Sequence, residues 1–323
     1  NRKENESYNH MEKMGNETSV KEFILEGFPA VQHLGKLLFG VLLLLYLVSI
    51  VGNTVIVMIM WMDHRLQIPM YLFLSGFSFL ECCFTTSVIP KLLAIFLSGM
   101  QTISFAACLT QTFVFLTLGV TGFFLMAVMS IDRYMAICNP LHYHSIMTMR
   151  VSFLLILFCC SIGPIVTTSL IIKVSQLSFC GSNIIKHFVC DLGPLTQLSC
   201  SDTSSIESLA FFLALFIILS SLAVTIICYI NIALTITHLP SAKERQKAFS
   251  TCSSHLIVLF LMYGSCIFIY MKPNQANRLD TNKEAALINT VVTPVLNPFI
   301  YTLRNKQFRQ ALRDVIFKIK LLR

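Results

Sequence analysis

Residues 127–143 read AVMSIDRYMAICNPLHY, and they mark the point where a long apolar run gives way to polar sequence. No Asp, Glu, Lys or Arg occurs between Leu92 and Ile131, and the triplet Asp132-Arg133-Tyr134 then ends the run. Charged side chains at the edge of a membrane helix reach water or pair with each other, so this position costs them little. The stretch therefore predicts that a membrane-spanning helix ends at the triplet.

The rest of the chain has the same division into long apolar runs and short charged connections. Hydrophobic residues make up 55% of the chain and charged residues only 12%, whereas soluble domains carry about 25% charged residues. Seven runs approach or exceed the roughly 20 residues that a helix needs to cross a bilayer. A soluble protein is excluded, because its polar surface would be too small to cover these helices. The runs are 37–62, 68–90 (interrupted only by Glu81), 92–131, 151–172, 208–237, 248–271 and 285–303. They predict an all-α membrane protein, a seven-transmembrane helix bundle.

The basic residues predict the orientation of the bundle. Seven spans put the two termini on opposite sides of the membrane, and Lys and Arg are about twice as dense on the side that holds the carboxyl terminus. Basic connections stay inside the cell. The sequence therefore predicts an extracellular segment 1–36, a bundle 37–303 and a cytoplasmic tail 304–323 with a short amphipathic helix. The net charge of +8 is interpreted as attraction to anionic membrane lipid. A nucleic-acid partner is excluded, because no soluble domain presents these charges.

Two acceptor patterns for N-glycosylation lie in the first segment. They are Asn5-Glu6-Ser7 and Asn16-Glu17-Thr18. Since a natural start at Met11 or Met14 would remove the first pattern, Asn16 is the stronger candidate and Asn5 the weaker one.

The cysteines divide between the spans and the outer side. The chain has 12 cysteines, and those inside apolar spans are interpreted as small apolar packing residues. Four fall in outer segments, where the compartment is oxidising, and an even number there predicts two disulfides with three connectivities. The residue pattern alone does not choose between these connectivities. The four are Cys108, Cys180, Cys190 and Cys200.

Three further motifs lie at the ends of predicted spans. The second span opens on PMYLFLS (69–75), the sixth opens on KAFSTCSSH (247–255), and the seventh closes on PVLNPFIYTLRN (294–305). Together with DRYMAICNPLHY (132–143), and in this order, they resemble the olfactory-receptor branch of the rhodopsin-like G-protein-coupled receptors. The resemblance covers about residues 20–315. It implies a receptor that binds a small-molecule odorant and activates a stimulatory heterotrimeric G protein to raise cyclic AMP, with no cofactor and no enzymatic activity.

The resemblance also bears on the outer loop 173–207. It implies a Cys108–Cys190 disulfide that ties the loop across the pocket mouth and a Cys180–Cys200 disulfide within the loop. A competing interpretation takes His187-Phe-Val-Cys190-Asp191 as a metal-binding pattern proposed for this family. A disulfide-bonded sulfur cannot supply the thiolate that zinc or copper prefers, so no metal site is predicted. Cys252 and His255 on the sixth span are two ligands without a third.

The family motifs imply an activation switch. Pro298 removes a backbone hydrogen bond and lets the seventh span bend. Asp132 neutralises Arg133 at rest, and release of this pair would free Arg133 to face other polar side chains. Tyr263, which stands where the wider class has a toggle Trp, is predicted to be a pivot; the alternative is an interior Tyr with a merely structural hydrogen bond. The remaining switch residues are Tyr134, Tyr229, Asn297 and Tyr301.

Glu81 is a carboxylate deep within a span. An ionised acid there costs a few kcal/mol, so it needs a partner, a proton or a cation. The family implies a polar centre of Glu81, Asn53 and Asn297 that is able to hold sodium. Olfactory receptors usually carry a second Glu on the third span, where this chain has Gly122. This departure favours a protonated Glu81 over sodium binding.

The family places the ligand pocket between the third, fifth, sixth and seventh spans. Its lining carries no charge, so a small, neutral, mostly apolar ligand is predicted and a cationic one is disfavoured. Tyr270 is the best candidate to hydrogen-bond the ligand. A ligand of this size implies roughly micromolar to sub-millimolar affinity. The predicted lining residues are Phe115, Leu116, Gly119, Val120, Leu213, Ile217, Cys266, Ile267, Tyr270 and Thr290.

Two other functional classes fit the sequence poorly. A transporter or channel would show intramembrane charges along a pathway or broken helices in repeated halves. A membrane enzyme would need a nucleophile with a base or a metal cluster, and the intramembrane His255 has no acid on its own helix. Ligand-dependent nucleotide exchange on a G protein would separate the receptor from both.

Overall fold

The computed structural model describes residues 20–321 apart from 181, 272–282, 284–285 and 305. Inside the helices it describes the backbone alone at 247, 251, 267–271, 301–304, 306–307 and 316–321. Asn5 and Asn16 lie outside the described residues, as do the side chains of Ile267, Tyr270 and Tyr301.

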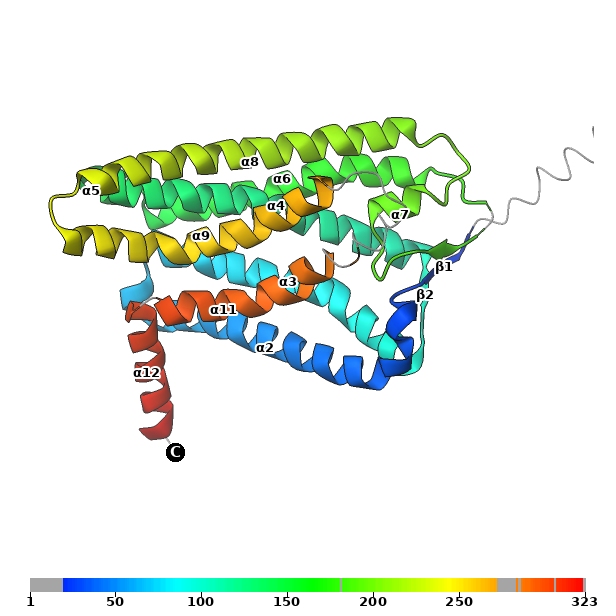
Figure 1. The fold of residues 1–323 in the computed structure, drawn as a ribbon, viewed down its shortest axis with the longest axis horizontal. Helices are drawn as coiled ribbons and strands as arrows, with labels where there is room; N and C mark the ends of the chain where they lie inside the picture. The colour runs from blue at the N-terminus through cyan, green and yellow to red at the C-terminus, as the bar shows by residue number, and fades with distance from the viewer. Residues whose placement is uncertain (1–19, 181, 272–282, 284–285, 305, 322–323) are drawn as a thin grey trace, which may run out of the picture.

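Long helices that lie along one common axis form the body of the molecule (Figure 1). By length and apolar composition, five helices of the described residues could cross a membrane, and a sixth qualifies if the bent pair 242–250 and 252–266, with 41° between its halves, is one span. A shorter apolar helix, Ile288–Ile300, follows these spans in the chain and includes a π-helical turn, η3 (Ile288–Val292). The helices of the bundle are α2 (Gly35–Met62), α3 (Pro69–Ser98), α4 (Phe105–Cys138), α6 (Met149–Ser175), α8 (Ser204–His238), α9 (Ala242–Met271) and α11 (Thr293–Arg304).

The boundary between the second and third helices differs from the expectation drawn from charge-free runs. The run 92–131 is not one helix, because α3 continues through Pro90 to Ser98 and α4 begins only at Phe105. A proline inside a membrane helix is tolerated where neighbouring groups satisfy the freed backbone. Gly99, with φ of +65°, then ends α3 in the left-handed conformation that glycine adopts without strain.

The two ends of the bundle carry different structures. One end, called the cap end, holds a three-stranded sheet of order β2-β1-β3 that the sequence analysis did not predict. The strand β1 (Glu22–Leu25) is antiparallel to β2 (Thr102–Ser104) and parallel to β3 (Ile184–Ile185). The small helices η1 (Pro29–Leu34) and α7 (Leu192–Thr196) also lie there.

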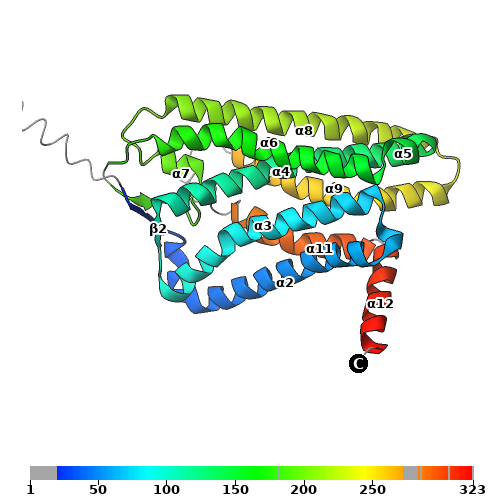
Figure 2. The same cartoon turned by 180° about the vertical axis from the view of Figure 1, so that it is seen from behind.

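The other end, called the tail end, holds η2 (His64–Leu66), α5 (Pro140–Ile146) and α12 (Lys306–Leu321). Figures 1 and 2 show α12 leaving the bundle across the direction of the other helices. Its Phe308 and Ala311 are buried in the same hydrophobic cluster as Leu66 and Tyr71, so packing fixes where α12 starts.

Close backbone contacts set the spacing of two helix pairs. A Cβ atom at Gly52 would lie 2.9 Å from the Pro298 ring, and one at Gly163 would lie 2.6 Å from the Thr117 carbonyl oxygen. Small residues let membrane helices approach in this way. As a result α2 packs directly on the Pro298 region of α11, and α6 packs directly on α4.

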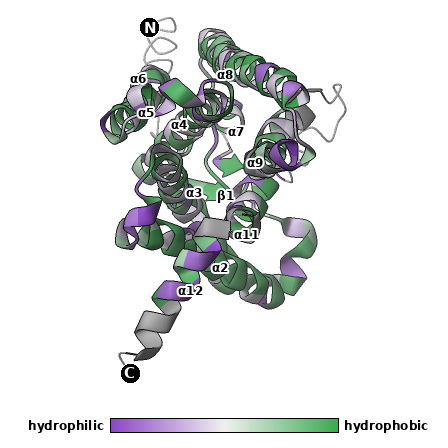
Figure 3. Cartoon of the chain, turned by 90° about the vertical axis from the view of Figure 1, so that its left-hand side faces the viewer, coloured by the Kyte–Doolittle hydropathy of each residue, from purple (hydrophilic) through white to green (hydrophobic). Residues whose placement is uncertain are grey.

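Large apolar side chains cover the outward faces of the helices. Phe216 on α8 is 67% exposed and Phe260 on α9 is 77% exposed, and hydrophobic colouring predominates along the bundle in Figure 3. An exposed apolar surface of this extent is typical of a lipid-facing bundle, not of a soluble domain.

Candidate functional site

The triplet at the end of α4 is buried and paired. Asp132 is 1% exposed and Arg133 6% exposed, and the Arg133 guanidinium donates a hydrogen bond to the Asp132 carboxylate. The other oxygen of Asp132 accepts a hydrogen bond of 2.8 Å from the Tyr143 hydroxyl on α5. Tyr143 was not among the predicted switch residues, although it closes the same sequence motif 11 residues after Asp132. Tyr134 lies beside the pair and is half-buried.

The predicted switch residue Tyr229 contacts α9. Its hydroxyl lies 2.7 Å from Nδ1 of His255, which is 4% exposed. A metal site built on Cys252 and His255 would need a third ligand. Across the described residues, no group of three His, Cys, Asp or Glu side chains is arranged to hold a metal ion. The contact between Tyr229 and His255 was not predicted from the sequence, and the role of Tyr229 in a switch stays a prediction.

The predicted pivot Tyr263 lies in the interior of the bundle. It is 5% exposed, and its ring centroid lies 5.5 Å from that of Phe123 on α4. The side chains of Ser221 and Thr225 on α8 are the hydrogen-bonding neighbours of its hydroxyl. These contacts from α9 to α8 fit the alternative of a structural hydrogen bond across helices, and the role of Tyr263 as a pivot stays a prediction.

The polar centre brings three helices together. Asn297 Nδ2 of α11 donates a 3.1 Å hydrogen bond to Glu81 Oε1 of α3. Asn53 of α2 donates to the backbone carbonyl oxygens of Ser49 at 2.9 Å and Pro294 at 3.0 Å. Four buried side-chain oxygens on these three helices have no hydrogen-bond partner among the described residues: Asn53 Oδ1, Ser78 Oγ, Thr293 Oγ1 and Asn297 Oδ1.

Gly122 on α4 faces the helix that carries Glu81. A Cβ atom at Gly122 would lie 3.8 Å from Leu80 Cδ2, which is ordinary van der Waals contact. A Cβ atom therefore fits at the position where the usual second Glu is missing.

The predicted pocket residues lie on the expected helices. Phe115, Leu116, Gly119 and Val120 are half-buried on α4. Among the described residues, no side chain and no backbone of another element lies within 4 Å of a Cβ built at Gly119. On the facing helices, Leu213 and Cys266 are half-buried and Ile217 is buried. Thr290 is fully buried in η3, and its hydroxyl donates to the Ala286 carbonyl oxygen at 2.7 Å. A ligand would therefore have to compete with the backbone for the Thr290 hydroxyl.

Two disulfides hold the cap end. They join Cys108 to Cys190 and Cys180 to Cys200, with Cα–Cα distances of 5.4 and 5.8 Å. Gln111 and Thr112 of α4 add hydrogen bonds of 3.0 Å to the backbone N–H and carbonyl of Cys190. The loop is thus fixed to α4 at Cys190 by one covalent and two hydrogen bonds.

His187 is part of this fixed loop. It is 1% exposed, and its Nδ1 accepts a 3.2 Å hydrogen bond from the Val189 N–H. Burial lowers the pKa of His187, Asp191 raises it and Lys283 lowers it further. Because the Cys190 sulfur is in a disulfide, the His187–Cys190–Asp191 pattern cannot offer a thiolate ligand.

The loop residues before Cys190 close the cap end of the bundle. Phe188 and Val189 are fully buried in a hydrophobic cluster that includes Val88, Val291 and the predicted pocket residue Phe115. The burial of Phe188 and Val189 was not predicted from the sequence, because a loop has no periodicity that shows which side chains point inward.

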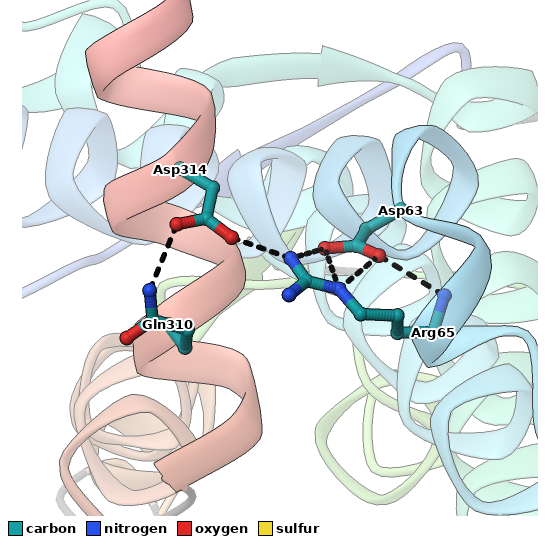
Figure 4. Close-up of polar contacts among 4 residues, drawn as sticks. All are labelled: Asp63, Arg65, Gln310 and Asp314. Carbon is teal, nitrogen blue, oxygen red and sulfur yellow. Dashed lines mark hydrogen bonds and ion pairs between the residues drawn. The ribbon is translucent and has the colours of Figure 1, made fainter.

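At the tail end an ion-pair cluster ties α12 to the loop before α3. Arg65 donates to the Asp63 carboxylate at 2.6 Å and to Asp314 of α12 at 2.5 Å, and Gln310 donates to the other Asp314 oxygen at 2.8 Å (Figure 4). The hydrogen bonds that Arg65 makes with Asp63 and Asp314 raise the pKa of Arg65. The hydrogen bond from Arg65 lowers the pKa of Asp314. The Arg65 side chain is 62% exposed, so the cluster is screened by water and salt.

The comparison with protein families decides what this bundle is. A family model described as olfactory receptor matches residues 42–319. The chain belongs to the olfactory receptor family. It is 50% identical to mouse olfactory receptor 6E1 over 312 residues, which is 95% of this chain and 98% of the relative. It is 48% identical to human olfactory receptor 6C2 over 309 residues, 96% of this chain and 99% of the relative.

A solved structure supports the fold at lower identity. The crystal structure of squid rhodopsin matches this olfactory receptor with a TM-score of 0.65 and 18% identity, over 90% of this chain and 86% of the other. The prediction of a seven-helix membrane bundle with a short carboxyl-terminal helix is confirmed. Family membership implies odorant sensing through G-protein signalling by a multi-pass plasma-membrane protein, and not an enzyme.

Proposed function

We propose that this receptor binds a small, neutral, mostly apolar volatile within the bundle and activates a stimulatory G protein to raise cyclic AMP. The observation that carries the ligand class is the uncharged lining. The Phe115 ring on α4 stacks on Phe84 of α3 at 4.9 Å, at the depth where a cationic ligand would need an acid. The predicted lining residues are the proposed contacts, with Tyr270 as the hydrogen-bonding one.

The proposed orientation puts the cap end outside the cell and the tail end inside. The disulfides at the cap end suit an oxidising compartment, and the basic residues concentrate toward the tail end. We propose that the boundaries 1–36, 37–303 and 304–323 separate extracellular segment, bundle and cytoplasmic tail. Asn16 and Asn5 are then accessible for glycosylation.

We propose that α12 contacts membrane lipid while the rest of the tail end contacts the G protein. Phe308 and Ala311 face the bundle and are buried, whereas Arg309 and Arg313 are exposed one turn apart. Exposed arginines next to an apolar face attract anionic headgroups. The switch is assigned to Asp132, Arg133, Tyr134, Tyr229, Tyr263, Asn297, Pro298 and Tyr301.

The test is a panel of neutral volatile compounds on cells that carry a cyclic-AMP reporter, with Tyr270→Phe as the variant. Loss of one neutral hydrogen bond should weaken a polar agonist by about 2- to 13-fold and spare its hydrocarbon analogue. Equal shifts for both compounds would remove Tyr270 as the polar anchor. If no panel compound raises cyclic AMP at a surface-expressed receptor, the proposed ligand class is wrong.

A further inference from the structure

Residues Glu22–Phe28 form a strap across the cap end. The backbone N–H groups of Ile24 and Glu26 donate to the loop of β3, at Asn183 and Ile185, over 2.8 and 2.9 Å. On the other side, the Leu25 N–H donates to the Gln101 carbonyl oxygen over 2.9 Å. The strap therefore joins two loops that are far apart in the sequence, and Figure 1 shows it at the end of the bundle opposite α12.

The end of the strap covers the pocket side of the bundle. Phe28 lies between two parallel rings, with centroid distances of 6.4 Å to Phe96 of α3 and 5.3 Å to Phe188 of the loop. Phe188 also stacks on His187 at 4.7 Å. Phe28 and Phe188 belong to the same hydrophobic cluster as Phe115, the residue proposed to line the pocket. A ligand that arrives from the cap end has to displace this part of the strap.

A charged contact joins the strap to the segment before the seventh helix. Lys283 Nζ lies 2.9 Å from Glu26 Oε2, and the two side chains are 5% and 33% exposed. A nearly buried ammonium group is costly to leave without a counter-ion, whereas the one-third exposed carboxylate stays within reach of water and salt. Contacts of this kind open more readily than a disulfide or a strand ladder.

We propose that the Glu26–Lys283 ion pair is the latch of an odorant entry port, which opens when the strap residues Glu26–Phe28, beyond the end of β1, lift from Lys283. The port rests on the proposed function and orientation, because it supposes a ligand that enters from the cap side. The latch limits the rates of ligand entry and exit, and it changes the affinity of the closed complex little. Electrostatic neighbours of the latch are His187, which responds to Lys283, and Asp191.

The first experiment measures the rates of response onset and washout with the most potent compound from a panel of neutral C6–C10 alcohols, aldehydes and esters. Glu26→Gln and Lys283→Met should each speed both rates about fivefold, with potency changed by less than about twofold. The exchanged pair Glu26→Lys with Lys283→Glu should restore rates near those of wild type. Glu22→Gln, which removes an exposed acid from the same strand, is the matched control and should leave the rates unchanged.

The second experiment needs no odorant. A membrane-impermeant N-hydroxysuccinimide ester, applied to cells, should acylate Lys283 about fivefold faster in Glu26→Gln than in wild type or Glu22→Gln. Peptide mass spectrometry of surface receptor reads the rate, so reduced delivery of a variant does not affect the result. Equal acylation rates, unchanged odorant rates in the single variants, or a potency shift without a rate change would each overturn the latch. A wild-type receptor that ignores every volatile but shows the acylation difference would contradict the proposed function and leave the latch standing.

Discussion

The cap end and the tail end of this olfactory receptor are held together by different kinds of bond. At the cap end two disulfides and a strand ladder fix the loops, and Phe23 and Leu25 of β1 are fully buried beneath them. At the tail end the helices meet through side chains, as in the Asp132–Tyr143, Tyr229–His255 and Arg65–Asp314 contacts. Covalent and backbone contacts resist rearrangement, whereas side-chain contacts exchange partners. The comparison indicates that the tail end is where α9, already bent by 41°, can move.

The largest effect should come from breaking the cap end at Cys190→Ser. The Cys108–Cys190 disulfide closes 82 residues and the Cys180–Cys200 disulfide 20, so chain entropy gives about 4.5 against about 3.3 kcal/mol of stabilisation. Cys190→Ser should abolish surface delivery and Cys180→Ser should reduce it less, as measured by surface labelling. Cys160→Ser, at an exposed free cysteine, is the control. Normal delivery of Cys190→Ser would contradict the view that the cap must be fixed.

The second-largest effect should come from changing the buried ion pair at the tail end. Arg133→Ala removes the cation of the buried pair, so cyclic-AMP responses should be lost while the receptor still reaches the surface, because the cap end is untouched. Surface-normalised reporter signals make the measurement. Responses near those of wild type would remove Arg133 from the switch.

Tyr143→Phe should loosen the resting state without destroying the switch. The Asp132 carboxylate would lose its hydrogen bond from α5, and a hydrogen bond to a charged group contributes about 1.5–3 kcal/mol. Asp132 then holds Arg133 less firmly, and ligand-free cyclic-AMP production should rise. Tyr46→Phe, at a hydroxyl bonded to Thr86 far from the triplet, is the control. Basal activity that falls, or rises equally in both variants, would contradict the assignment.

Between the two ends, Gly122→Glu tests the polar centre. A Cβ fits at Gly122, so the variant would offer a second carboxylate to the Glu81 region. Sodium sensitivity of basal signalling should increase relative to wild type, with potassium as the control cation. The same sodium response in both receptors would show that Gly122 is not the missing ligand position.

The smallest effect is expected at the exposed tail contact. Asp314→Asn removes the carboxylate that pairs with Arg65 at the surface, and the melting temperature of purified receptor should change by no more than about 2 °C. The pKa of Asp314 is lowered in the folded state, so its contribution is present above the ordinary value of 3.8 and is lost as the pH falls through the folded value. A melting shift as large as that of Cys180→Ser would mean that the ends do not differ as proposed.

Sequence patterns were sufficient to predict the features that depend on contact with lipid or water and on the order of residues along the chain. A helix in hydrocarbon must satisfy its own backbone hydrogen bonds, so apolar length alone predicts the spans. The triplet at 132–134 marks a helix end because charges seek water, and the motif around it carried the family. The same reasoning failed at 92–131, where α3 passes Pro90 and uses residues assigned to the next span. Proline is a strong stop in water and a weak one inside a packed membrane bundle.

Only the tertiary structure decided which groups meet across helices and loops. The pairing of Tyr229 with His255, of Tyr143 with Asp132 and of Glu26 with Lys283 depends on helix rotation and loop path. A linear pattern does not encode these quantities, because each side chain has many partners at the same membrane depth. The strand β1 was missed for the same reason, since its hydrogen-bond partners lie in loops about 80 and 160 residues away. The sequence by itself determined the class, the family and the motifs, because these follow from composition and local order. Packing determined that disulfides and a strand ladder join the loops at one end, whereas side-chain contacts join the helices at the other.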